Sequence, residues 1–249
     1  MSGWLVVAGL GPGNEALVTP EVTTALAQAT DIVGYIPYVA RVAPRDGLTL
    51  HPTDNRVEGE RAAHALEMAA AGRRVVVVSS GDPGVFAMAA AVFEALEAGP
   101  DTWRDIDIRV LPGITAMLAA SARVGAPLGH DFCAINLSDN LKPWELIERR
   151  LRLAVEADFA IALYNPRSKA RPEGFARTLG LLREACDDDR PILFARAVST
   201  PEEVLTIVPL SQAKPEMADM RTMIIIGSSQ TRVITRAGAP ILYTPRSVI

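Results

Sequence analysis

Two glycine-containing turns carry polar side chains that can bind a ligand. Ser79–Gly84 follows a run of four valines and precedes a helical pattern, and Leu111–Thr115 repeats this arrangement one predicted strand later. Asp82 and Thr115 can each accept hydrogen bonds from a ligand, or each can only cap the helix that follows. Because ligands of open parallel sheets bind at the carboxyl ends of the strands, the two turns together favour one concave binding site.

A third turn, Gly9–Gly13, follows the first predicted strand. A dinucleotide-binding fingerprint needs three glycines spaced G-x-G-x-x-G that open directly into a helix. Here Pro12 removes one amide donor and the next helix begins only at Thr19. No Lys-Ser or Lys-Thr pair follows, so the spacing does not fit a nucleoside-triphosphate loop either. The turn allows a ligand to approach the backbone closely, or it is simply a tight turn.

Three cations lie close together after a predicted strand that ends at Tyr164: Arg167, Lys169 and Arg171. They can bind carboxylate or phosphate groups, or they can form an ordinary solvated loop. His130 lies next to Asp131, and histidine is a common acid–base catalyst, although a lone histidine is more often structural.

The composition excludes several classes of protein. The 249 residues are 49% apolar and 22% charged, which predicts a folded chain with a large core. A net charge of −4 disfavours a protein that binds nucleic acid through its phosphates. Two cysteines, Cys133 and Cys186, are too few for a disulfide framework or a zinc site. No window reaches the ~18 apolar residues of a membrane span and no targeting signal is evident, so we expect a cytoplasmic protein without a membrane partner.

Alternating apolar runs and helical patterns predict an α/β fold with two α/β domains, residues 1–124 and 125–249. The first sheet is expected to be parallel, because the valines of the third strand leave no polar face. The second is expected to be mixed, since its last strands follow one another with little helix between them. The predicted strands are 4–9, 31–34, 74–79, 108–111, 132–137, 159–164, 192–195, 204–209 and 223–227. The first predicted helix begins at Thr19. The other predicted helices span 60–71, 85–97, 115–124, 143–156 and 174–186.

The order and spacing of five motifs resemble the tetrapyrrole (class III) S-adenosylmethionine-dependent methyltransferases. These motifs are Gly9–Gly13, Gly81–Pro83, Pro112–Thr115, Tyr164–Pro166 and Met223–Gly227. Further segments are similar to the branch that methylates C17 of precorrin-3B and contracts its ring to precorrin-4 in cobalamin (vitamin B12) biosynthesis. They are Pro127–Phe132, Asn136–Asp139, Pro143–Glu145, Phe194–Ala197 and Thr200–Glu203.

The resemblance implies a cleft between the two domains that binds S-adenosylmethionine and releases S-adenosylhomocysteine. It also implies a homodimer. The cofactor contacts that it implies are Pro12, Gly81, Asp82, Val85, Thr115, Ala116, Asn165 and Ala197, with Gly227 as a weaker addition. No metal is needed, because the methyl group is already activated on a sulfonium. For the ring contraction our hypothesis is that His130 is the acid–base catalyst, since it lies at the predicted domain junction. We expect Arg167, Lys169 and Arg171 to bind the acetate and propionate groups of the substrate.

Other functions are compatible with the same residues. Within the family, the substrate can instead be another precorrin, cobalt-factor III or the diphthine intermediate of a translation factor. Outside it, Gly9–Gly13 can belong to a nucleotide-dependent oxidoreductase, and a non-catalytic tetrapyrrole carrier can keep the same fold.

Overall fold

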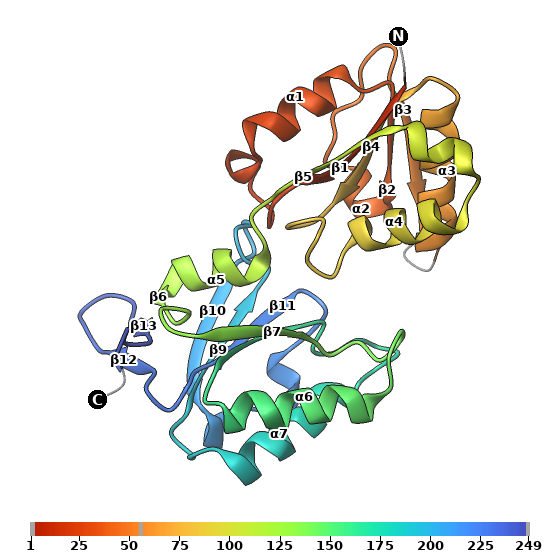
Figure 1. Cartoon of the computed structure of the whole chain (residues 1–249). Helices are drawn as coiled ribbons and strands as arrows, with labels where there is room; N and C mark the ends of the chain where they lie inside the picture. Colours follow the sequence, from red (N-terminus) through yellow and green to blue (C-terminus); the bar gives the residue numbers. More distant parts are fainter. Residues whose placement is uncertain (1–2, 55–56, 248–249) are drawn as a thin grey trace. The chain divides into compact units, whose positions relative to one another are not determined.

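The computed structural model describes residues 3–54 and 57–247. The chain forms two compact units that divide between Thr115 and Ala116, each with its own sheet (Figure 1). The expected boundary at residue 124 lies one helix later than this division. By its contacts, that helix, α5 (Ala116–Val124), groups with the second unit, where it packs on strands β11 (Thr222–Ile226) and β13 (Ile241–Tyr243).

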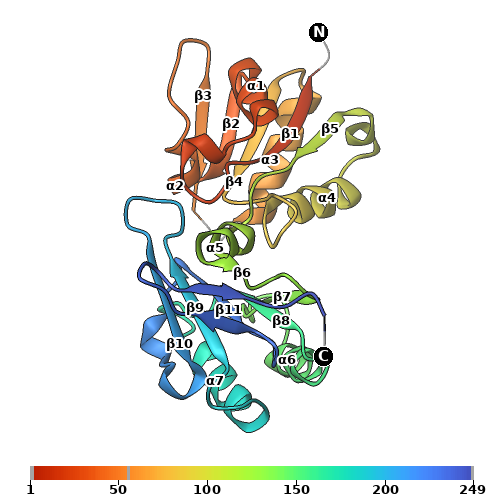
Figure 2. The same cartoon turned by 90° about the vertical axis from the view of Figure 1, so that its left-hand side faces the viewer.

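The first unit is a five-stranded sheet in the order β3-β2-β4-β1-β5, with every neighbouring pair parallel. Figure 2 shows this sheet from β3 at one edge to β5 at the other. The strands are β1 (Trp4–Gly9), β2 (Asp31–Tyr35), β3 (Thr49–Thr53), β4 (Arg74–Ser79) and β5 (Asp107–Leu111). The helices are α1 (Pro20–Gln28), α2 (Ile36–Val39), α3 (Glu58–Ala70) and α4 (Met88–Ala98), with short 3-10 turns at Glu15–Leu17 and Asp101–Asp105.

The valines of β4 explain why this sheet is covered on both faces. Val75 and Val77 pack among side chains of α3 and α4, whereas Val76 and Val78 pack against α1 and α2. All four valines are fully buried. Successive side chains of a strand point to opposite faces, so a strand without a polar face requires helices on both sides. The expected parallel sheet is confirmed.

The second unit has a mixed five-stranded sheet in the order β10-β9-β11-β8-β7. Strands β7 (Phe132–Asn136) and β8 (Ala160–Tyr164) are parallel, whereas β11 (Thr222–Ile226) is antiparallel to β8 and to β9 (Pro191–Arg196). β10 (Val204–Pro209) is antiparallel to β9. The expected mixed sheet is confirmed.

Helices cover both faces of this second sheet, as Figure 1 shows. α6 (Trp144–Glu156) and α7 (Gly174–Ala185) bury their apolar side chains with Ile161 and Leu163 of β8 on one face. α5 lies on the other face. Short 3-10 turns, Leu210–Gln212 and Pro215–Met217, precede β11, and β6 (Gly125–Ala126), β12 (Arg232–Ile234) and β13 (Ile241–Tyr243) form a small separate sheet. None of the helices in the described ranges is long and apolar enough to cross a bilayer.

Candidate functional site

Three glycine-containing turns meet at the carboxyl edge of the first sheet. β4 and β5 are the two neighbours of β1, so the turns that follow these three strands lie side by side. Gly11 and Gly81 exchange two backbone hydrogen bonds of 3.1 and 2.9 Å. A Cβ on Gly9 would lie 2.5 Å from the Gly81 carbonyl oxygen and 2.7 Å from the Gly113 nitrogen. The turns of Asp82 and Thr115, which we expected to form one site, therefore lie in contact with the turn after β1. Glycine is required where their backbones approach so closely.

The carboxylate of Asp82 connects two of these turns. Its Oδ1 accepts a hydrogen bond from the Gly84 amide at 2.8 Å, and its Oδ2 accepts one from the Gly113 amide at 3.1 Å. The helix expected from Val85 begins only at Met88, so Asp82 does not cap it. Asp82 is half-buried. A carboxylate has about four acceptor positions, so this side chain can also accept hydrogen bonds from a ligand.

The other predicted cofactor residues of the first unit belong to the same turns. Pro12 is half-buried in the turn after β1, and half-buried Val85 donates its amide to the Asp82 carbonyl at 3.3 Å. Thr115 is buried, with 5% of its surface exposed, at the end of the turn after β5. The structure thus brings together Pro12, Gly81, Asp82 and Val85, and it places Thr115 on the adjacent turn.

In the second unit, Asn165 and Ala197 occupy equivalent positions. Each directly follows a strand, β8 or β9, and both strands end at the same edge of the sheet because both are antiparallel to β11. Each has a left-handed backbone, with φ of +52° at Asn165 and +48° at Ala197. For an alanine this conformation costs about 1–2 kcal/mol. Such strain concentrates at ligand sites, which makes this edge a candidate.

Hydrogen bonds hold both residues in place. The Asn165 Nδ2 donates to Asn136 Oδ1 at 3.0 Å, which joins the ends of β8 and β7. The Ala197 amide donates to the Arg221 carbonyl at 2.9 Å, and the Thr200 hydroxyl donates to the Ala197 carbonyl at 2.8 Å.

Ala116, the first residue of α5, is half-buried. The next residue, Met117, donates its amide to the Tyr164 hydroxyl at 3.3 Å, which ties α5 to the end of β8.

The predicted substrate-binding cations lie at this same edge, in the segment between β8 and α7. Arg167 is half-buried and Lys169 is exposed. The Arg171 Nη1 lies 3.5 Å from the Leu137 carbonyl oxygen, and its Nε lies 3.8 Å from Asp139 Oδ1. All three cations therefore lie in the segment that begins with Asn165, at the end of β8.

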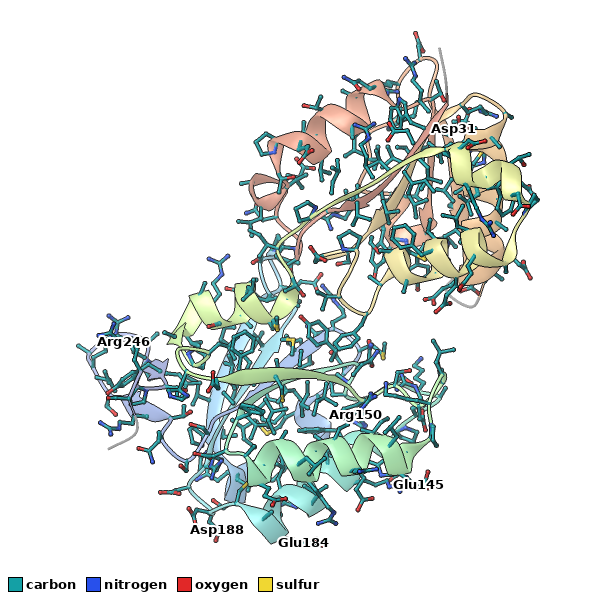
Figure 3. The ribbon with its side chains drawn as sticks, in the orientation of Figure 1. Asp31, Glu145, Arg150, Glu184, Asp188 and Arg246 are labelled. Carbon is teal, nitrogen blue, oxygen red and sulfur yellow. The ribbon has the colours of Figure 1, made fainter. Side chains whose placement is uncertain are left out.

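Lys142 is a further cation at this edge, and no motif in the sequence indicates it. Its Nζ donates to the Ser138 carbonyl at 3.1 Å, one residue from the carbonyl that Arg171 contacts. Burial lowers the pKa of Lys142, the charges of Arg150 and Arg171 lower it further, and Asp139 offsets part of the shift. Arg150, labelled in Figure 3, belongs to α6. These cations are far apart in the sequence, so only the folded chain shows that an anion would be stabilised here.

His130 and Gly227 lie at the opposite edge of the second sheet. His130 precedes β7, and its Nδ1 lies 3.8 Å from Asp131 Oδ2. Gly227 follows β11 and donates its amide to the Pro191 carbonyl at the start of β9. The five residues of β7 span roughly 16 Å at about 3.3 Å per residue. The structure therefore does not bring His130 or Gly227 together with Asn165, Ala197 or the cations.

Among the described residues, no group of three or more His, Cys, Asp or Glu side chains is arranged to hold a metal ion. The polar groups at the two edges are backbone amides and carbonyls, carboxylates, amides and cations. Such groups bind and orient an organic ligand that has charged and hydrogen-bonding substituents.

Comparison with known proteins shows the family to which the chain belongs. The family described as Tetrapyrrole (Corrin/Porphyrin) Methylases matches residues 5–214. The chain belongs to this family and is a methyltransferase.

Within this family, the chain is similar to several individual methyltransferases. A precorrin-3B C(17)-methyltransferase from Sinorhizobium sp is 53% identical over 247 residues, which cover 99% of this chain and 97% of the relative. A probable cobalt-factor III C(17)-methyltransferase from Salmonella typhimurium is 39% identical, and the match covers 92% of this chain and 94% of that protein. The crystal structure of the methyltransferase CobJ superposes with a TM-score of 0.94 at 70% identity, covering 98% of this chain and 100% of that one.

A more distant structure shows that the fold is shared more widely. The uroporphyrin-III C-methyl transferase from Thermus thermophilus, complexed with S-adenyl homocysteine, superposes with a TM-score of 0.67 at 24% identity. The match covers 90% of this chain and 92% of that one.

Proposed function

We propose that this chain transfers a methyl group from S-adenosylmethionine to C17 of precorrin-3B and contracts the macrocycle to precorrin-4 in cobalamin biosynthesis. The observation that carries the proposal is the 53% identity over nearly the whole of both chains with a precorrin-3B C(17)-methyltransferase. The 70% identity with CobJ supports it. The resemblance of the sequence motifs had already favoured this reaction.

The residues of the two edges suit S-adenosylmethionine. The glycines let the backbones of the three turns approach one another closely, and Asp82 offers a carboxylate to amino or hydroxyl groups. We assign the contacts to Pro12, Gly81, Asp82, Val85, Thr115, Ala116, Asn165 and Ala197. Gly227 is left out of this set because it lies at the other edge of its sheet. The distant relative that is complexed with S-adenyl homocysteine supports this class of cofactor.

When bound, S-adenosylmethionine supplies a methyl group that is already activated on sulfur. The chain's own task is then to align the electron-rich carbon of the macrocycle with that group and to exclude water. Such alignment can contribute roughly 7–11 kcal/mol to lowering the barrier. The rigid turns suit this task because Asp82 and the exchange of hydrogen bonds between Gly11 and Gly81 fix their backbones.

The ring contraction requires a proton to leave a hydroxyl group while a carbon–carbon bond migrates, so an acid–base side chain would assist it. His130 remains our hypothesis from the sequence, although it lies at the edge of the second sheet away from the substrate-binding cations. Lys142 lies at the edge of those cations. Comparing His130→Ala with Lys142→Met distinguishes the two, because loss of the true group leaves methylation intact and blocks contraction.

Calorimetry tests the proposed cofactor class. We expect S-adenosylmethionine and S-adenosylhomocysteine to bind the purified chain and NADH not to bind. Binding of NADH alone would support an oxidoreductase instead.

Turnover assays with precorrin-3B and cobalt-factor III then compare the two substrates, and we expect precorrin-3B to be preferred. Binding of a tetrapyrrole without methyl transfer would indicate a carrier. The predicted homodimer is tested by analytical ultracentrifugation.

A further inference from the structure

Arg41 reaches from the end of α2 to the turn that follows β1. Its guanidinium donates hydrogen bonds to the carbonyl oxygens of Leu10, Gly11 and Gly13, the last two at 3.2 and 3.3 Å. The side chain is half-buried. Burial lowers the pKa of Arg41, and the charges of Glu15 and Tyr38 oppose this shift. A cation withdrawn from water needs such acceptors, and the carbonyls of the turn provide them.

The contacts of Arg41 complement those that the turn makes with Gly81. The peptide between Leu10 and Gly11 is held on both sides, because its carbonyl accepts from Arg41 and its amide donates to the Gly81 carbonyl. The next carbonyl, that of Gly11, accepts from both Arg41 and the Gly81 amide. Glycines have many accessible backbone conformations. Without the arginine, the two hydrogen bonds between Gly11 and Gly81 would remain, but the carbonyls of Leu10, Gly11 and Gly13 would lose the guanidinium donor.

We propose that Arg41 is a positioning residue for cofactor binding: it holds the turn of residues 10–13 in the shape that S-adenosylmethionine requires. This inference rests on the proposed function. Arg41 acts through the backbone of the turn and not through contact with the cofactor. It connects the carboxyl end of β2 with that of β1, although β4 lies between these two strands in the sheet.

Arg45 provides a matched control within the same unit. It also donates to three backbone carbonyls, those of Leu26, Ala27 and Ala29, at 2.9, 2.8 and 2.7 Å. These carbonyls lie at the carboxyl end of α1, just before β2, and therefore at the other edge of the sheet from the turns. Capping the end of a helix in this way contributes to stability. Replacing either arginine by methionine removes the donors and keeps a long, unbranched side chain.

The experiment measures the affinity for S-adenosylhomocysteine by calorimetry and the free energy of unfolding by urea, in Arg41→Met, Arg41→Lys and Arg45→Met. We expect Arg41→Met to weaken the affinity about tenfold or more, since hydrogen bonds from a charged donor are involved. Arg41→Lys should weaken it less, because an ammonium group can reach only some of the carbonyls. Arg45→Met should lose stability and keep the wild-type affinity. In steady-state assays Arg41→Met should raise the KM for S-adenosylmethionine and leave the KM for the tetrapyrrole unchanged.

Two results would overturn the inference. One is wild-type affinity in Arg41→Met, and the other is an equal loss of affinity in Arg45→Met, which would indicate a general effect of stability. If Arg41→Met does not fold, the same comparison is made with Arg41→Lys, whose unchanged affinity would overturn the inference. Failure of the wild-type chain to bind S-adenosylhomocysteine is a different result, because it removes the proposed function itself.

Discussion

In the cation group at the end of β8, Lys169 is exposed and Arg167 is half-buried. Arg171 contacts the Leu137 carbonyl, so its replacement would also disturb the local structure. We therefore predict the effect of the double variant Arg167→Gln/Lys169→Gln. Each solvent-exposed ion pair with a substrate carboxylate contributes about 0.2–1 kcal/mol. The KM for the tetrapyrrole should rise about three- to tenfold, with a much smaller change in kcat.

The double variant Arg104→Gln/Arg109→Gln is the control for this prediction. It removes the same charge from the first unit, where Arg104 pairs with Asp101 and Arg109 pairs with Asp107. Its KM for the tetrapyrrole should equal that of the wild type. An unchanged KM in Arg167→Gln/Lys169→Gln would contradict the assignment of these cations to the substrate.

Asp31 predicts a specific dependence of stability on pH. It is fully buried at the start of β2 (Figure 3) and accepts hydrogen bonds from Thr30, His51 and Arg73. Burial acts to raise the pKa of this carboxyl. The three hydrogen bonds and the charge of Arg73 lower it more, so the net pKa lies below its usual value.

A carboxyl whose pKa is lowered on folding stabilises the protein above its unfolded pKa, and this contribution is lost as the pH falls through the folded pKa. Urea unfolding should therefore show stability decreasing from about pH 4 downward. Asp31→Asn should be less stable at neutral pH and should show a shallower decrease. Asp46→Asn, which changes an exposed aspartate, should keep the wild-type profile. An equally steep decrease in Asp31→Asn would show that other groups cause it.

Some residues of the candidate site could be predicted from the sequence and others could not. Asp82 was predicted because its residue type and its place after a strand both indicate a ligand-binding turn. Ala197 has no functional group, so only the family resemblance indicated it. Its left-handed backbone now gives a physical reason to consider this end of β9 as part of a ligand site. Arg41 and Lys142 were missed because their partners are backbone carbonyls. A contact of that kind leaves no pattern of residue types in the sequence.

The three turns at the edge of the first sheet form a single structural element because their backbones are in contact. We predict that Gly9→Ala weakens the binding of S-adenosylhomocysteine at least tenfold, since its Cβ would lie 2.5 Å from the Gly81 carbonyl oxygen. We expect overpacking of this kind to cost about 1–3 kcal/mol of stability. Calorimetry and urea unfolding measure the two effects.

Gly180→Ala is the control for the effect of an added methyl group. Gly180 lies in α7, and a Cβ there would point into open space, with no atom within 4 Å apart from its chain neighbours and the backbone of its own helix. Alanine is favoured over glycine inside a helix by about 0.5–1 kcal/mol, so this variant should be more stable and bind with wild-type affinity. If Gly9→Ala also bound with wild-type affinity, the close packing of the turns would not matter for the ligand.

Most strands and helices could be predicted because apolar periodicity and turn residues reflect burial directly. The edge strand β3 was missed because it contains Pro52 and all its residues are exposed or half-buried, so it lacks a buried apolar run. Proline is tolerated there because an edge strand has unpaired amides. The helix predicted from Val85 begins at Met88, and Phe86 has a left-handed backbone that is incompatible with a helix. Strands as short as β6 give no periodic signal.

For the whole molecule, local patterns indicated two α/β units but not the order of their strands. β4 lies between β1 and β2, and β11 lies between β8 and β9. These orders depend on long-range packing. The sequence placed the boundary after residue 124, where Gly125 and Ala126 pair with β13 inside the second unit. The contacts divide the chain before α5 instead.

A labelled methyl group shows directly which atom of the macrocycle receives it. The purified chain is incubated with precorrin-3B and S-adenosylmethionine that carries an isotopically labelled methyl group, and the product is examined by NMR. We predict that the label appears on C17 of a contracted macrocycle and that S-adenosylhomocysteine is released in equal amount. Label on another carbon, or no transfer to precorrin-3B at all, would contradict the proposed function.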